Sequence, residues 1–79
     1  MDRQFLRLSF TPENVAEPIV YQIGLQFGLT TNIIRANVSQ DGGWVVLELV
    51  GDPENAMHAI DWARGKGVSV ETVREELPG

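Results

Sequence analysis

The chain has 79 residues, of which 43% are apolar and 22% charged, with no cysteine and a formal net charge of −5. The lack of cysteine excludes disulfides, thiolate metal sites and Cys nucleophiles within the chain, and an acidic chain with scattered basic residues does not suit nucleic acid as a partner. No apolar run approaches the roughly 18 residues of a membrane helix and no signal peptide is visible, so we expect a cytoplasmic protein without membrane insertion.

The first half of the chain predicts a strand followed by a helix. Residues 5–10 alternate between apolar and polar types, which is typical of a strand. Proline is tolerated in the first turn of a helix but not in its interior. We therefore expect a loop over residues 11–16, a helix over residues 18–27, and a C-terminal cap at Gly28. The apolar helix positions recur every four residues and should face the sheet: Ile19, Ile23 and Phe27.

The second half predicts a hairpin, a helix and a strand. Two β-rich runs joined by Asp-Gly indicate a hairpin over residues 32–50. Asp52 and Pro53 are typical of an N-cap and a first helical position, so a helix should run over residues 53–64. A final strand is expected over residues 68–73, followed by a polar tail over residues 74–79.

This order predicts the fold class. Strand, helix, strand, strand, helix, strand, joined by right-handed crossovers, gives a four-stranded antiparallel sheet of order 4-1-3-2 with both helices on one face. We expect an α+β, ferredoxin-like domain over residues 1–79, with its ordered core over about residues 5–73.

The hairpin register decides which side chains share a face. With Asp41 and Gly42 as the two loop residues, Arg35 lies across from Glu48, a favourable cross-strand ion pair that a turn at Gly42-Gly43 would lose. We therefore expect the turn at Asp41-Gly42. This register assigns three residues of the first hairpin strand to the core: Ile34, Ala36 and Val38.

The sheet face away from the helices, called the open face below, is expected to be unusually apolar. It would carry Phe5, Ile33, Trp44, Val46, Val50 and Val73, interspersed with Arg7, Arg35, Glu48 and Glu71. Monomers seldom expose large apolar patches, which favours an interface, and a homodimer is its simplest form. We name four residues as interface candidates: Phe5, Trp44, Val46 and Val50. In the alternative interpretation, these side chains lie near strand ends and are shielded by long polar neighbours.

No catalytic constellation is visible. His58 is the only histidine, too few for a metal site that also lacks cysteine. The glycine pairs match neither a P-loop nor a dinucleotide-binding motif. We expect no enzyme activity, no cofactor and no metal.

Several segments together resemble the NIL domain family. They are residues 5–11, Pro18, the triplet Asn32-Ile33-Ile34 in place of Asn-Ile-Leu, and residues 67–71. The resemblance implies a ferredoxin-like domain, found in methionine importer ATP-binding subunits and some ferredoxin-type proteins, that pairs with its copy and binds methionine near that interface. By this resemblance Asn32, with Ile33 and Ile34, would lie at the ligand.

Two functions remain open. The chain is either a regulatory domain that binds a small amino acid as a homodimer, or an interaction module that docks on a transporter ATPase or an iron–sulfur protein without a ligand. Asn32 also has a purely structural interpretation, as a residue at a strand start whose side-chain amide hydrogen-bonds to the local backbone.

Overall fold

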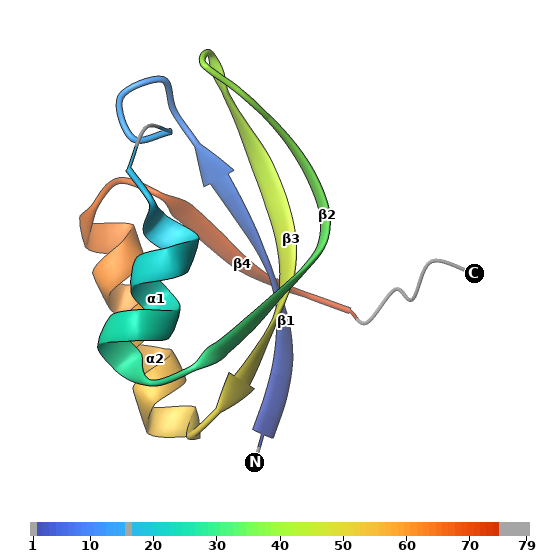
Figure 1. Ribbon diagram of the computed structural model, residues 1–79, viewed down its shortest axis with the longest axis vertical. Coiled ribbons are helices and arrows are strands. Elements are labelled where there is room, and N and C mark those ends of the chain that lie inside the picture. Colours follow the sequence, from blue (N-terminus) through green and yellow to red (C-terminus); the bar gives the residue numbers. More distant parts are fainter. Residues whose placement is uncertain (1, 16, 75–79) are drawn as a thin grey trace.

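The computed structural model describes residues 2–15 and 17–74. Their elements, in chain order, are β1 (Asp2–Phe10), α1 (Ile19–Phe27), β2 (Thr30–Ser39), β3 (Gly42–Gly51), α2 (Pro53–Gly65) and β4 (Ser69–Val73). The strands form one antiparallel sheet in the order β2-β3-β1-β4, and both helices lie on the same side of it (Figure 1). The predicted order 4-1-3-2 is this sheet counted from the other edge, so the predicted α+β sheet topology is confirmed.

The core lies between the helices and the two central strands. The expected alternation is present, since Leu6 and Leu8 of β1 are buried together with every second residue of β3 from Val45 to Leu49. α1 contributes Ile19 and Ile23, as predicted. α2 contributes small side chains, which allow the helix backbone to approach the sheet closely: Ala56, Ala59 and Ala63.

The helix ends follow the predicted capping chemistry. α1 begins directly after Pro18 and ends at Gly28, which adopts the left-handed conformation with φ of 64°. At the start of α2, a side-chain oxygen of Asp52 accepts hydrogen bonds from the backbone N–H groups of Glu54 and Asn55, at 2.8 and 3.3 Å. These local signals therefore set both ends of α1 and the start of α2.

The predicted turn at Asp41-Gly42 is wrong. Ser39 pairs with Gly42, so the loop residues are Gln40 and Asp41. The positive φ values expected within the turn occur just after it, at Gly42 (112°) and Gly43 (147°). A Cβ at Gly43 would overlap the carbonyl oxygen of Asn37, and one at Gly42 would lie 2.6 Å from the carbonyl oxygen of Phe10. Both glycines are thus needed inside the strand, where the neighbouring backbones leave no room for a side chain.

A bulge in β2 is a second difference from the predicted register. The pairing shifts between Ile33 and Arg35, which places Asn32 across from Glu48 and Arg35 across from Val46. The predicted Arg35–Glu48 cross-strand match is therefore absent from this ladder.

The predicted core residues of β2 are also only partly correct. Ile34, at the bulge, is half-buried, whereas Ala36 is exposed and Val38 is 45% exposed. β2 is the edge strand of the sheet, and the buried side chains belong to the strands nearer the centre.

Two further expectations concern the ends of the chain and the membrane. Of the predicted tail, Arg74 follows β4, and residues 75–79 lie outside the described residues. Neither described helix has the length and apolar content needed to cross a bilayer.

Candidate functional site

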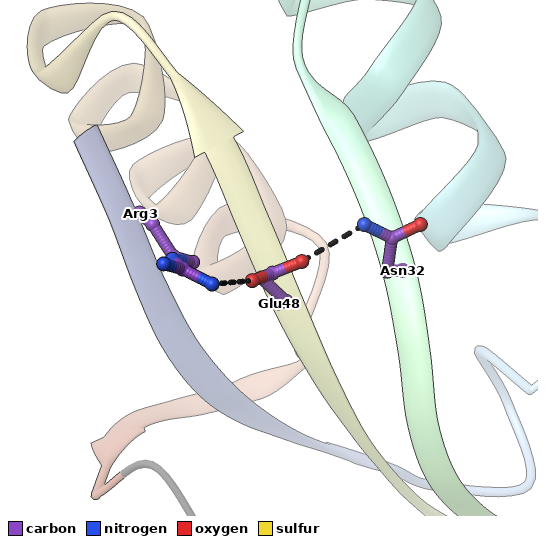
Figure 2. A network of polar contacts seen from close by, with 3 residues as sticks. All are labelled: Arg3, Asn32 and Glu48. Carbon is purple, nitrogen blue, oxygen red and sulfur yellow. Dashed lines mark hydrogen bonds and ion pairs between the residues drawn. The ribbon is translucent and has the colours of Figure 1, made fainter. Parts of the chain in front are cut away.

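Three polar side chains from three strands meet on the open face. Glu48 of β3 lies between Arg3 of β1 and Asn32 of β2 (Figure 2). The Arg3 guanidinium Nη1 donates to Glu48 Oε2 at 3.0 Å, and the Asn32 amide Nδ2 donates to Glu48 Oε1 at 2.9 Å. Both carboxylate oxygens of Glu48 are thereby occupied, so its ionised form is held in a defined orientation.

This network changes the acidity of Glu48. The hydrogen bond from Asn32, followed by the one from Arg3, lowers the pKa of the Glu48 carboxyl below its ordinary value, whereas desolvation acts in the opposite direction. The Glu48 side chain is 15% exposed and that of Arg3 is 60% exposed. The carboxylate is therefore partly shielded while the guanidinium remains open to solvent and to a ligand.

The structure separates the three residues that the resemblance assigned to a ligand. Asn32 lies on the open face in the network. Ile33 pairs with Leu47, whose side chain is buried under the helices, so Ile33 belongs to the helix side of the sheet and not to the open face where it was expected. Ile33 is 58% exposed at the sheet edge. Ile34 occupies the bulge beside it and is half-buried.

Sequence reasoning missed one member of the network and misplaced another. Arg3 was left outside the first strand, which begins at Asp2 and not at residue 5. Arg3, Phe5 and Arg7 occupy every second position, so the strand pattern extends toward the N-terminus, and this could have placed Arg3 in the strand. Glu48 was expected to pair with Arg35, an error that follows from the wrong turn.

The apolar residues of the open face form a half-covered stripe. Five of the six predicted residues share this face and each is half-buried: Phe5, Trp44, Val46, Val50 and Val73. The Arg7 guanidinium lies over the Trp44 ring, 5.1 Å from its centroid, and shields part of it. Shielding by long side chains, the alternative weighed above, thus accounts for some of the coverage.

An apolar hollow lies on the helix side of the sheet edge. It has a volume of about 160 Å³, and its walls come from the loop before α1, the first turn of α1 and the ends of β1, β2 and β3. Its lining includes Val15, Pro18, Val20, Tyr21, Val38 and Val45. The exposure of Val38 at its rim was not predicted.

Metal-binding geometry is not found in the described residues. Within residues 2–15 and 17–74, no three His, Asp or Glu side chains are grouped so that they could hold an ion.

Comparisons with known proteins agree on one family. The family model of the NIL domain matches residues 4–72. The chain is 31% identical over 75 residues to the methionine import ATP-binding protein MetN 2 of Acinetobacter baylyi, covering 90% of this chain and 22% of that protein. It is 32% identical over 71 residues to the methionine import ATP-binding protein MetN of Cupriavidus metallidurans, covering 85% of this chain and 21% of that protein. The chain thus spans about a fifth of the length of these curated relatives.

A solved structure has the same arrangement of elements. The C-terminal domain of an ABC transporter ATP-binding protein from Enterococcus faecalis superposes with a TM-score of 0.80 at 27% identity, covering 92% of this chain and 86% of that one. The family match extends over nearly the whole described chain. This protein belongs to the NIL domain family.

Proposed function

We propose that this chain is a cytoplasmic, non-catalytic regulatory domain that binds a small amino acid at or near an interface between two copies of itself. Methionine is the first candidate ligand, because the curated relatives are named methionine import ATP-binding proteins. The domain spans residues 1–79 with a ferredoxin-like fold, an assignment supported by the element order and by both helices lying on one side of the sheet.

The Asn32–Glu48–Arg3 network is the observation that carries the proposal. A free amino acid presents an ammonium group, which needs a carboxylate acceptor, and a carboxylate, which a guanidinium binds well. Glu48 and Arg3 supply these two groups side by side, and Asn32 can both donate and accept. Binding would replace the Arg3–Glu48 ion pair by contacts to the two charged ends of the ligand.

The surroundings of the network suit an apolar ligand side chain. Phe5 lies across from Glu48, and Val50 lies across from Arg3, in the ladder between β1 and β3. Both side chains are half-buried on the open face. A thioether or similar side chain could therefore lie along this stripe, with a second copy of the chain covering it.

Calorimetric titration with L-methionine tests the ligand. We expect saturable heat with the wild-type chain, and binding at least 10-fold weaker with Asn32→Ala, because the Glu48 carboxylate loses its orientation. Asn37→Ala is the matched control: Asn37 lies on the same strand and face, across from Trp44 and outside the network. No heat at millimolar L-methionine, or equal loss in both variants, would contradict the proposed ligand site.

Sedimentation velocity tests the homodimer. If Phe5, Trp44, Val46 and Val50 form the interface, Trp44→Asp should shift the chain to the monomer, because an ionised carboxylate would be buried against an apolar stripe. His58→Asp, on an exposed position of α2, is the control for added negative charge. Self-association that survives Trp44→Asp would contradict an interface on this face.

A second function is favoured by the same stripe. The chain could dock on a partner, such as a transporter ATPase or an iron–sulfur protein, through the open face without a ligand. Half-buried aromatic and branched residues on an uncovered sheet face support this. Absence of methionine heat, together with Trp44-dependent capture of a purified importer ATPase, would favour docking over ligand binding.

A further inference from the structure

Phe5 is the aromatic residue of the open face that lies beside the Asn32–Glu48–Arg3 network. It is directly across from Glu48 in the ladder between β1 and β3, which places the two Cβ atoms about 5 Å apart. Trp44, the other aromatic residue of this face, is four positions from Glu48 along β3, or about 13 Å. Of these two rings, Phe5 is therefore the one within reach of a small amino acid held by Glu48.

The two arginines that flank Phe5 along β1 leave its ring open to a ligand. Arg3 and Arg7 lie two positions before and after Phe5, on the same face of the strand. The Arg3 guanidinium donates to Glu48, and the Arg7 guanidinium lies over the Trp44 ring, 5.1 Å from its centroid. Both long side chains are thus engaged away from the Phe5 ring, which is half-buried on this face.

The two sides of the network differ in polarity. Toward β2, the residue across from Glu48 is Asn32, which is polar. Toward β4, Phe5 is followed by Val73, its partner in the ladder between β1 and β4. An apolar ligand side chain gains free energy when it leaves water against apolar groups, so it should run over Phe5 toward Val73.

We propose that Phe5 makes this site select a thioether side chain over an aliphatic side chain of the same length. This inference rests on the proposed amino-acid function and adds the residue that decides the choice of ligand. A thioether sulfur makes a favourable contact with an aromatic ring at about 5 Å, often at the ring edge, and a methylene group in its place lacks this contact. Phe5 therefore contacts the ligand sulfur, while Glu48 and Arg3 hold the two charged ends.

Methionine and norleucine separate this effect from hydrophobicity. Their side chains have the same length, and norleucine has a methylene group where methionine has sulfur. Burial of apolar surface alone favours norleucine, because a methylene group gains more by leaving water than a thioether does. A sulfur–ring contact acts in the opposite direction and favours methionine by about 2- to 10-fold. The preferred ligand therefore shows which of the two effects is larger.

Calorimetric titration of the wild type and two variants tests the selection. It gives the dissociation constants of L-methionine and L-norleucine for the wild-type chain, Phe5→Leu and Phe5→Tyr. The wild type should bind methionine more tightly by about 2- to 10-fold, and Phe5→Leu should lose or reverse this preference. Phe5→Tyr keeps an aromatic ring and should retain it. Melting temperatures show that each variant remains folded.

Val73→Ala is the matched control for apolar surface. Val73 lies on the other side of Phe5 from Glu48 and is half-buried, but it carries no ring. Its truncation should weaken the binding of both ligands by a similar factor and leave their ratio within about 2-fold of the wild-type ratio. As a direct measurement, NMR of the methionine complex should show nuclear Overhauser effects between the ligand methyl group and the Phe5 ring protons.

The possible results keep this selection apart from the proposed function. No heat with either ligand would contradict the amino-acid function, and selection by Phe5 would fall with it. Saturable methionine heat with a ratio that Phe5→Leu leaves unchanged, or a wild type that prefers norleucine, would overturn selection by Phe5 and leave the amino-acid function standing. A ratio that Val73→Ala changes as much as Phe5→Leu would assign the preference to apolar surface and would also overturn selection by Phe5.

Discussion

Asn32 and Glu48 lie across from one another in the ladder between β2 and β3, with the Asn32 amide nitrogen 2.9 Å from Oε1 of Glu48. Counted from the hairpin turn, the bulge between Ile33 and Arg35 moves the earlier residues of β2 by one position relative to β3, so that Asn32 faces Glu48 and not Leu49. The motif asparagine is thus brought to a carboxylate by an irregularity of the strand that carries it.

Removing the Asn32 amide should raise the pKa of Glu48. The Asn32 hydrogen bond is the largest influence that lowers this pKa, so Asn32→Ala should return it toward the ordinary value. A carboxyl whose pKa is lower in the folded chain adds stability above the unfolded-state pKa of about 4.3, and this stability is lost as the pH falls through the folded-state value. Carbon-detected NMR titration of the Glu48 carboxyl measures the shift, and urea unfolding at pH 7 and about pH 2 measures the linked stability.

The stability difference between wild type and Asn32→Ala should therefore be present at pH 7 and shrink toward zero in acid. Asn37→Ala should leave the pKa of Glu48 unchanged. A stability difference that is independent of pH would show that Asn32 acts through packing and not through the carboxylate.

Alanine at Gly43 should destabilise the chain strongly. Its φ of 147° and the overlap of a Cβ with the Asn37 carbonyl oxygen act together, and we expect a loss of about 1–3 kcal/mol or more in the free energy of unfolding. Gly65→Ala is the control, because this last residue of α2 has open space around it; it should be neutral or stabilise by up to about 1 kcal/mol. Chemical denaturation measures the free energy of unfolding of both variants. Comparable losses of stability in the two would be inconsistent with strain at Gly43.

The same substitution in the two hairpin strands should have unequal effects. Val45 is 5% exposed and Val38 is 45% exposed, although the predicted register placed Val38 in the core. Val45→Ala should cost about 1.5–3 kcal/mol in the free energy of unfolding, and Val38→Ala about 0.5 kcal/mol or less. Equal costs in urea unfolding would favour the register that the structure contradicts.

The N-cap of α2 should contribute to the free energy of unfolding through its hydrogen bonds, and this contribution can be separated from that of its charge. Asp52→Ala removes the acceptor for two backbone N–H groups and should cost about 0.5–2 kcal/mol. Asp52→Asn should recover most of this, since asparagine caps as well as aspartate, and Asp61→Ala on the exposed surface of α2 should change stability by about 0.5 kcal/mol or less. A loss with Asp52→Asn as large as with alanine would assign the effect to charge and not to capping.

The elements of this fold could be predicted because their signals are local. Pro18, Gly28 and Asp52 each act on the backbone within a turn of their own position, and all three helix boundaries they predict are observed. The strand alternation likewise identified the buried residues of β1 and β3. The sheet order then followed from chain connectivity.

The register could not be predicted because its causes are distant in sequence. The Asp41-Gly42 pair is typical of a turn. In the structure, however, position 42 lies in β3 and must be glycine because a Cβ there would overlap the carbonyl oxygen of Phe10, which lies on another strand. The bulge lies at two adjacent isoleucines, Ile33 and Ile34. Because both are apolar, the alternation of apolar and polar residues along the strand does not show where the register shifts. The family resemblance therefore named Asn32 as a candidate, while its hydrogen-bond partner Glu48 was found only once the pairing was known.

The central position of β1 has a consequence for how the chain folds. β1 is synthesised before the other three strands of this sheet, yet its partners are β3 and β4, and Phe5 pairs with both Glu48 and Val73. Loop-closure entropy must be overcome across most of the chain before those pairings stabilise it, so folding should be slower than for a helical bundle of this length. On the ribosome, β1 cannot complete its ladders until the last strand has left the exit tunnel.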